Sequence, residues 1–369
     1  MVLNLKIGIV GLPNVGKSTL FNALTNAGAL AANYPFATIE PNVGIVPVPD
    51  ERLDVLAKMY ETDKVVPATV EFVDIAGLVA GASKGEGLGN KFLAHIRECQ
   101  AICHVVRAFK NNDIVRADNR PEDDIIKQAK EDIDIINLEL QLADEETKAK
   151  VDAKRKKDPN DENIPYLTDK PVIYMFNVDE QGLTDKTLQQ ELTNMVKDIH
   201  ENRPFASIRD NGSERRSAAR NDGPARGGEQ KDGSVNPQAI FVNAKLEEEM
   251  SGMNRDERKE FLESYGVKDD ALGELIKAAY ETLGLQSFLT AGKKECRAWT
   301  IKKGATAPEA AGTIHSDFER GFIAANICNY NDLKELGSEQ AVRAAGKLRT
   351  EGKTYVMQDG DVVEFKFNV

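Results

Sequence analysis

The chain has 369 residues, of which 41% are hydrophobic and 29% charged, and its formal net charge is −12. This length suffices for two domains, and the composition is that of a water-soluble globular protein with a sizeable core. A protein this acidic does not attract nucleic acid through its net charge. Any contact with nucleic acid therefore needs a local basic patch. The first residues lack a signal pattern and no apolar run approaches about 18 residues, so we expect a cytoplasmic protein away from membranes. The four cysteines are too few and too scattered for a disulfide framework, and we expect them to be reduced core residues.

Strands and helices are predicted to alternate along most of the chain. Residues 5–10 form a predicted buried strand that feeds a helix at 18–26, and further strands are predicted at 70–75, 101–108, 171–177 and 239–242. Helical patterns lie between them, which predicts an α/β fold with a mainly parallel sheet.

Two stretches interrupt this alternation. Residues 122–157 are strongly helical and charged, which predicts an excursion of one or two helices out of the sheet. Residues 201–236 are rich in Gly, Ser and Asn and poor in aliphatic side chains, which predicts a mobile loop.

The sequence changes character after Gly284, where a compact α+β module is predicted. Its predicted elements are a strand at 297–301, a short helix at 308–315, a strand at 321–327, and a hairpin over 355–367 that turns at Asp359-Gly360.

The segment 11–18 (GLPNVGKS) matches the P-loop pattern G-x-x-x-x-G-K-[ST] and stands between a predicted strand and a predicted helix, as that motif requires. Successive backbone N–H groups and the helix N-terminus would surround the phosphates. Lys17 would reach the β- and γ-phosphates, and the Ser18 hydroxyl would ligate Mg²⁺. The predicted nucleotide-binding residues here are Asn14, Val15, Gly16, Lys17, Ser18 and Thr19.

Two further segments are predicted to sense the nucleotide. Asp74 ends a buried strand in the pattern D-x-x-G, where it would approach Mg²⁺ through a water while the Gly77 N–H meets the γ-phosphate. The loop 33–40 (NYPFATIE) offers Thr38, whose hydroxyl can ligate Mg²⁺ and whose N–H can bind the γ-phosphate. Thr25 is the competing threonine, but it falls inside the first predicted helix.

The segment 177–180 (NVDE) follows a strand at the place where guanine-specific G proteins carry N-K-x-D. Glu180 is one methylene longer than aspartate, which moves the carboxylate by about 1.5 Å and disturbs paired acceptance from guanine. The Asn177 amide can meet the N6 amino group and N7 of adenine together. We therefore predict ATP preference over GTP, with backbone groups near Val178 and in residues 243–245 as further candidates. An ordinary acidic loop is the alternative.

With these residues in place, the chain resembles the YchF family of Obg-like, ribosome-binding ATPases. The resemblance covers nearly the whole chain and is most specific at 11–22 (GLPNVGKSTLFN), 33–42 (NYPFATIEPN), 74–79 (DIAGLV), 81–90 (GASKGEGLGN), 297–301 (RAWTI) and 359–369 (DGDVVEFKFNV).

The resemblance implies a Ras-like, Obg-type G domain over residues 1–284, with a helical insertion at about 120–168, and a C-terminal TGS domain of β-grasp form at 285–369. It also implies ATP preference, Mg²⁺ dependence and ribosome association. In residue terms, Mg²⁺ ligands fall on Ser18 and Thr38, and an altered base-recognition element falls on Asn177 and Glu180. We further expect a monomer.

The sequence departs from the family's pattern in several places. The helical insertion is short, and residues 201–236 look like an additional loop. Leu78 stands where Ras-like proteins carry a water-orienting glutamine, and Arg116 stands where bacterial relatives are expected to carry a catalytic histidine. An arginine can stabilise transition-state charge but cannot act as a general base, so Lys17 and Arg116 are the catalytic candidates and slow turnover is expected.

Two other functional classes remain open at this point. One is an Obg-type GTPase, and the other is a nucleotide-gated ribosome-binding module in which hydrolysis is vestigial. The basic run over residues 148–157 is read equally well as a solvated helix face or as a ribosomal-RNA contact.

Overall fold

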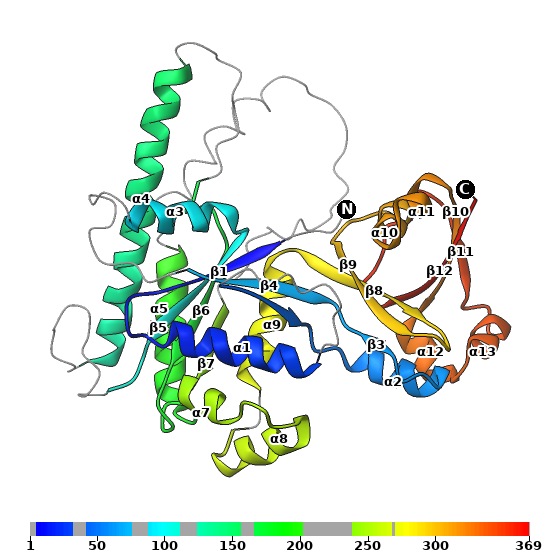
Figure 1. Ribbon diagram of the computed structural model, residues 1–369, viewed down its shortest axis with the longest axis horizontal. Coiled ribbons are helices and arrows are strands. Elements are labelled where there is room, and N and C mark those ends of the chain that lie inside the picture. Colours follow the sequence, from blue (N-terminus) through cyan, green and yellow to red (C-terminus); the bar gives the residue numbers. More distant parts are fainter. Residues whose placement is uncertain are drawn as a thin grey trace, which may run out of the picture.

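The computed structural model describes residues 5–31, 42–75, 88–110, 124–155, 166–201, 238–267 and 270–368, which are arranged around two sheets (Figure 1). The strands of the first sheet are β1 (Lys6–Val10), β2 (Val43–Pro47), β4 (Thr69–Asp74), β5 (Ala101–Arg107), β6 (Val172–Asn177) and β7 (Gln238–Val242). The helices in this part of the chain are α1 (Lys17–Ala31), α3 (Leu88–Glu98), α4 (Ile125–Arg155), α5 (Lys186–Glu201), α7 (Ala244–Glu249), α8 (Arg255–Ser264) and α9 (Ala271–Thr282).

The strands of the second sheet are β3 (Val65–Val66), β8 (Leu285–Ala291), β9 (Cys296–Lys302), β10 (Phe322–Asn329), β11 (Arg349–Glu351) and β12 (Asp361–Phe367). The helices beside it are α2 (Glu51–Tyr60), α10 (Ala307–Ile314), α11 (Ser316–Arg320), α12 (Tyr330–Leu336) and α13 (Glu339–Ala344).

The first sheet has the strand order β2-β4-β1-β5-β6-β7, and every neighbouring pair is parallel except β2 with β4. Each residue of β5 is buried, as expected for a central strand of a parallel sheet that helices cover on both faces. The predicted α/β class and the five predicted strands are thereby confirmed. Because the strands are parallel, β1, β4, β5 and β6 all end at the same edge of the sheet.

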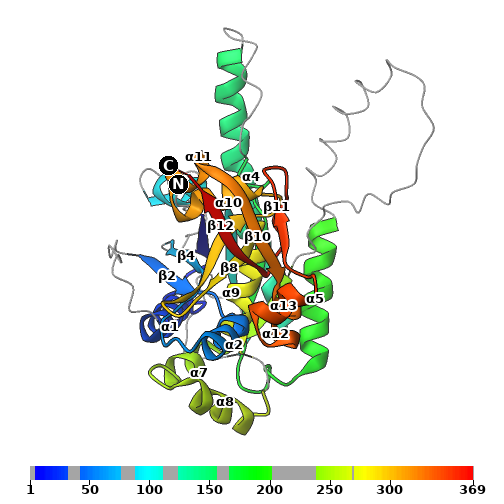
Figure 2. The same ribbon diagram turned by 90° about the vertical axis from the view of Figure 1, so that its right-hand side faces the viewer.

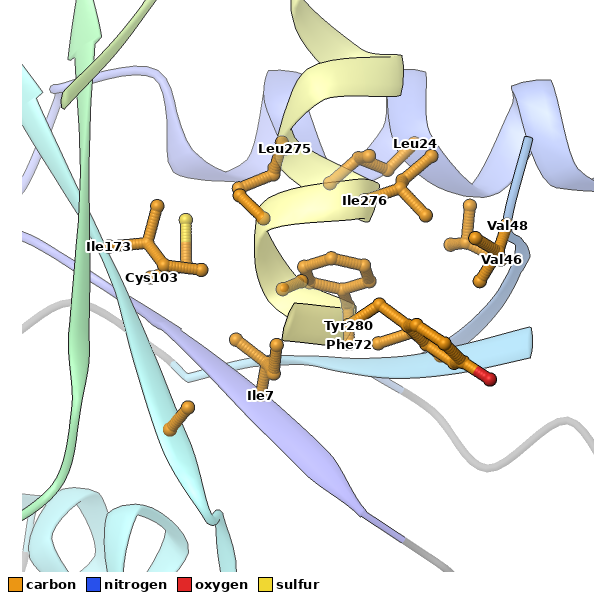
Figure 3. Packing of buried hydrophobic residues seen from close by; sticks show 14 of the residues in the cluster. Ile7, Leu24, Val46, Val48, Phe72, Cys103, Ile173, Leu275, Ile276 and Tyr280 are labelled. Atoms are coloured by element: carbon orange, nitrogen blue, oxygen red, sulfur yellow. The ribbon is translucent and has the colours of Figure 1, made fainter. Parts of the chain in front are cut away.

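Helices pack on both faces of this sheet. Successive residues of β6 point to opposite faces, so they belong to different core clusters. Ile173 belongs to a core cluster with Leu275 and Ile276 of α9, which lie together in Figure 3. Tyr174 belongs to a second cluster with side chains of α4 and α5, including Ile133. All four cysteines are free and buried, as predicted.

The helix α4 is one continuous element of 31 residues. Its first half carries Ala129 and Ile133 into the core beside β5 and α5, whereas its second half extends beyond the sheet (Figures 1 and 2). The excursion predicted at 122–157 is corrected accordingly, because the first half of this helix belongs to the layer that covers the sheet. Among the described helices, α4 included, none combines the length and the apolar character that crossing a membrane requires.

The second sheet has the order β11-β10-β12-β8-β9-β3. The strands predicted at 297–301 and 321–327 and the helix predicted at 308–315 are confirmed as β9, β10 and α10. The hairpin predicted over 355–367 is wrong. Its second half is β12, but β12 pairs with β10 and β8, and the preceding residues make a single isolated bridge, between Val356 and Thr306.

The segment between β2 and β4 joins the two sheets. It leaves the first sheet, forms α2, adds β3 to the edge of the second sheet and then returns as β4. Val65 of β3 pairs with Cys296 of β9, and the Cys296 N–H donates to the Lys64 carbonyl at 3.0 Å. The second sheet is therefore completed by a strand from the N-terminal part of the chain.

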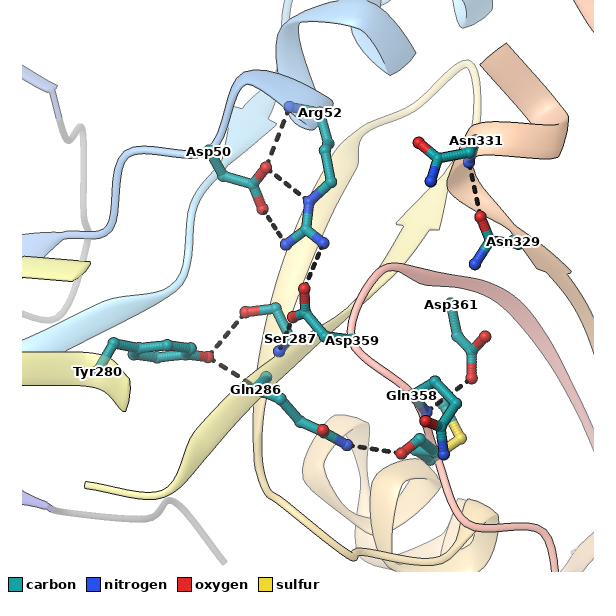
Figure 4. A network of polar contacts seen from close by, with 11 residues as sticks. Asp50, Arg52, Tyr280, Gln286, Ser287, Asn329, Asn331, Gln358, Asp359 and Asp361 are labelled. Carbon is teal, nitrogen blue, oxygen red and sulfur yellow. Dashed lines mark hydrogen bonds and ion pairs between the residues drawn. The ribbon is translucent and has the colours of Figure 1, made fainter. Parts of the chain in front are cut away.

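A polar network reinforces this junction (Figure 4). Asp50 caps α2 and accepts hydrogen bonds from the Arg52 guanidinium, at 2.8 Å from both Nε and Nη2. The remaining nitrogen, Nη1, donates to Asp359 in the turn before β12 at 2.7 Å. Asp359 also accepts from the Ser287 N–H of β8 at 3.0 Å, so one aspartate links α2 to two strands of the second sheet.

We expect Arg52→Ala to lower the free energy of unfolding by about 1–2 kcal/mol, because it removes charged hydrogen bonds that are only partly screened by solvent. Urea unfolding can be followed by the fluorescence of Trp299, the chain's one tryptophan, which lies in β9. Lys130→Ala is the control, because Lys130 and Asp134 form an exposed ion pair within α4. Equal urea midpoints for the two variants would show that the Arg52 contact does not stabilise the junction.

Candidate functional site

The predicted P-loop, Asp74 and Asn177 meet at one edge of the first sheet. The P-loop follows β1, Asp74 is the last residue of β4, and Asn177 is the last residue of β6. In the register, Ile9 of β1 is opposite Asp74, and Arg107 at the end of β5 is opposite Asn177. Val15 and Asn177, which are 162 positions apart in the chain, are thereby brought within hydrogen-bond distance.

Glycines shape the P-loop at both of its ends. Gly16 has a positive φ of 98°, and a Cβ there would lie 2.5 Å from Nδ2 of Asn177. A Cβ on Gly11 would lie 2.4 Å from the Val105 carbonyl oxygen of β5. The motif's two glycines are thus required by the close approach of the loop to two neighbouring strands.

Lys17 is the first residue of α1 and is buried. Its Nζ donates to the Leu12 carbonyl at 2.7 Å, which turns the amine back over the loop. Burial lowers the pKa of Lys17, and the negative charge of Asp74 partly opposes this effect. The first turn of α1 carries no acidic side chain, so nothing in that turn competes with bound phosphates for this cation.

Asp74 lies next to Lys17 and Ser18. Burial raises the pKa of Asp74, while the charge of Lys17 and a hydrogen bond from Ser18 lower it. One carboxylate oxygen, Oδ1, is buried and has no hydrogen-bond partner among the described residues. An unsatisfied buried oxygen is costly, and a hydrated Mg²⁺ beside the Ser18 hydroxyl would satisfy it. The donor set therefore fits the predicted metal.

Asn177 holds the site together through both ends of its amide. Its Nδ2 donates to the Val15 carbonyl of the P-loop at 3.0 Å, and its Oδ1 accepts from the Ala244 N–H of α7 at 3.0 Å. Nδ2 keeps a second hydrogen and Oδ1 a second lone pair, so the paired contact of this amide with adenine stays a prediction. Asn177 shapes the site from beneath the P-loop.

The two acidic residues that follow differ in their surroundings. Asp179 accepts from the Gly182 N–H at 2.9 Å and so is part of a turn. Glu180 is exposed, and its carboxylate has no partner among the residues that the structure describes. The carboxylate of Glu180 is thus free of other contacts among the described residues, and the sequence places Glu180 in the predicted base-recognition element.

Two of the remaining predicted residues are exposed or partly exposed, and the others fall outside the described residues. Asn14 is exposed with a positive φ of 62°, and Thr19 is partly exposed in the first turn of α1. Thr38, Gly77, Leu78 and Arg116 lie outside the described residues, as does the loop predicted at 201–236 except for Glu201, the last residue of α5. The sequence did not reveal that the Ala244 N–H anchors Asn177, although Asn243 directly after a strand was a helix-cap signal, and its side chain does cap α7.

Comparisons with known proteins agree with this geometry. Residues 6–178 match the family model described as "50S ribosome-binding GTPase". Residues 285–368 match the model named "YchF-GTPase_C", described as "Protein of unknown function (DUF933)".

The similar proteins span the entire fold. "Ribosome-binding ATPase YchF" of Bacillus subtilis (strain 168) is 47% identical over 99% of this chain and 100% of its own length. The protein of that name in Pasteurella multocida (strain Pm70) is 46% identical over 100% of both chains. The solved "Structure of the Schizosaccharomyces pombe YchF GTPase" superposes with a TM-score of 0.72 and 35% identity over 98% of each chain. The chain described here belongs to the YchF family.

Proposed function

We propose that this protein is a magnesium-dependent ATP-binding and ATP-hydrolysing switch that associates with the ribosome. In this proposal residues 1–284 bind the nucleotide and residues 285–369 form the TGS domain, and the protein acts as a cytoplasmic monomer. The relatives' names, which combine ribosome binding with ATPase activity, support the assignment.

The observation that carries the proposal is the grouping of Lys17, Ser18 and Asp74. A buried amine beside a helix N-terminus is a site for phosphate oxygens, since both the charge and the free N–H groups face the anion. The unsatisfied Oδ1 of Asp74 supports a hydrated cation next to them. Bound Mg²⁺ would neutralise part of the phosphate charge.

The remaining parts of the switch are assigned from the sequence. Thr38 would be the second metal-ligating hydroxyl and, with the Gly77 N–H, would contact the γ-phosphate. Lys17 would stabilise charge on the transferring phosphoryl group, and Arg116 would add to that stabilisation. Turnover would be slow, since Leu78 cannot orient water and Arg116 cannot deprotonate it.

The solved relative and one family model carry the word GTPase, whereas the 177–180 segment of this chain favours adenine. Asp179 accepts from the Gly182 N–H as part of a turn, whereas Glu180 at the fourth position is exposed and has no partner among the described residues, so Glu180 is the candidate to face a base. Its longer side chain places both oxygens beyond the position that accepts the two guanine donors together. Adenine lacks those two donors, so it does not need a carboxylate that accepts from both at once. This chemistry favours ATP, with an Obg-type GTPase as the second candidate.

Ribosome association would use local basic groups, since the chain as a whole is acidic. The projecting half of α4 carries the exposed Lys148 (Figure 2), and the sequence is also basic at 154–157. A helix that extends beyond the body of the protein can present a charge such as that of Lys148 to ribosomal RNA without bringing the acidic surface close.

We expect Lys17→Ala to weaken Mg-ATP binding by about 10- to 100-fold, because a charged contact contributes ~1.5–3 kcal/mol. Ser18→Ala should act in the same direction and make binding less dependent on Mg²⁺. Isothermal titration measures both, and Lys277→Ala, an exposed lysine of α9, is the control. Near wild-type affinity in folded Lys17→Ala would remove the P-loop from the proposed mechanism.

Ribosome association should weaken steeply between about 50 and 200 mM salt, because basic groups that contact phosphates release counterions. Cosedimentation with purified ribosomes measures this, and Lys148→Glu should reduce both the binding and the salt slope. Lys277→Glu makes the same charge change away from α4. Salt-independent cosedimentation would instead point to an apolar contact with ribosomal protein.

A further inference from the structure

The helix α7 is tied to the nucleotide site at its first residue. The Ala244 N–H donates to Asn177, which in turn donates to the Val15 carbonyl of the P-loop, each at 3.0 Å. Asn243 caps the same end by accepting from Lys245 N and Leu246 N at 3.1 Å. The helix also lies beside α1, which starts at the P-loop lysine (Figure 1). A change in the position of α7 would therefore move the amide that shapes the P-loop.

A buried ion pair holds the other side of α7. Glu247 is only 3% exposed, and its Oε2 accepts from Nη2 of Arg258 in α8 at 2.8 Å. Asp270 lies 3.8 Å from the same Arg258 nitrogen. Burial raises the pKa of Glu247 to about 7, the positive charge of Arg258 acts to lower it, and the negative charge of Asp270 acts to raise it. The pair is thus sensitive to a single proton at neutral pH.

We propose that Glu247 and Arg258 are positioning residues of the nucleotide site, which fix α7 and through it the Asn177 amide beneath the P-loop. This inference rests on the proposed nucleotide-binding function. The side-chain ion pairs of Arg258 in the described structure run to Glu247 of α7 and to Asp270, so Arg258 acts on the nucleotide site through α7 and not by touching the P-loop. When the pair is intact, α7 is held in the orientation that satisfies Asn177. Without Arg258, the buried carboxylate takes up a proton and no longer binds α8.

The first test compares two adjacent residues of α8. We expect Arg258→Ala to weaken Mg-ATP binding by about 5-fold or more, within the usual range of coupling between separated sites. Lys259→Ala is the matched control, because Lys259 pairs with Glu263 on the exposed side of the same helix at 4.0 Å. Its affinity should equal that of the unmodified protein. Circular dichroism confirms that each variant is folded.

The second test uses Glu247→Gln, which keeps the size of the side chain and an acceptor for Arg258 but removes the titration. Nucleotide binding selects the paired, deprotonated state, so the affinity of the unmodified protein should fall as the pH drops through about 7. Protonation of the nucleotide itself affects both proteins alike. The additional pH dependence in the unmodified protein is therefore the signature of Glu247, and a purely structural role would not produce it.

The outcomes separate this inference from the proposed function. If the unmodified protein binds Mg-ATP, unchanged affinity in Arg258→Ala would overturn the positioning role alone. Identical pH profiles for Glu247→Gln and the unmodified protein would overturn it too, even if Arg258→Ala failed to fold. Absence of nucleotide binding in the unmodified protein would overturn both the proposed function and this inference.

Discussion

The nucleotide site depends on the parallel pairing of β1 with β4 on one side and with β5 on the other. This pairing brings the P-loop and Asp74 to the same sheet edge, and the next parallel pair, β5 with β6, adds Asn177. Lys17 and Asp74 are both partly desolvated there, so each perturbs the other's pKa. Such a site is most favourable when phosphate and a cation complete it, because the buried charges then gain partners. The proposed binding of a magnesium nucleotide would thus depend on the register of these four strands.

Asn177 extends this arrangement beyond the phosphates. One amide satisfies a carbonyl of the P-loop and an N–H of α7, so the geometry of the loop is coupled to a helix that would not touch the phosphates. On the other side of the sheet, the chain that leaves β2 builds α2 and β3 into the second sheet before returning as the strand that ends in Asp74. The chain that follows the predicted switch loop at 33–40 is thus linked to the C-terminal sheet by the ion pair between Arg52 and Asp359.

The sequence predicted best what is encoded locally. The P-loop, five of the six strands of the first sheet and the D-x-x-G aspartate are each a short pattern with a known backbone context, and they occupy the expected places in the fold, whereas β2 was not predicted. The errors concern long-range pairing. The turn at Asp359-Gly360 looked like a hairpin, but β12 finds its partners in β10 and β8, and alternating residues cannot reveal which strands will be neighbours. The structural contacts of Asn177 were not foreseen for the same reason, since its partners Val15 and Ala244 are distant in sequence.

The central claim is that this edge binds ATP in preference to GTP through its own P-loop and the 177–180 segment. The most direct measurement is a calorimetric titration of the unmodified protein with each nucleotide in the presence of Mg²⁺. The account predicts a dissociation constant for ATP about 10- to 100-fold lower than that for GTP. Restoring the shorter carboxylate in Glu180→Asp should narrow the difference. Equal dissociation constants for the two nucleotides in the unmodified protein would contradict the account and place the chain among the GTPases.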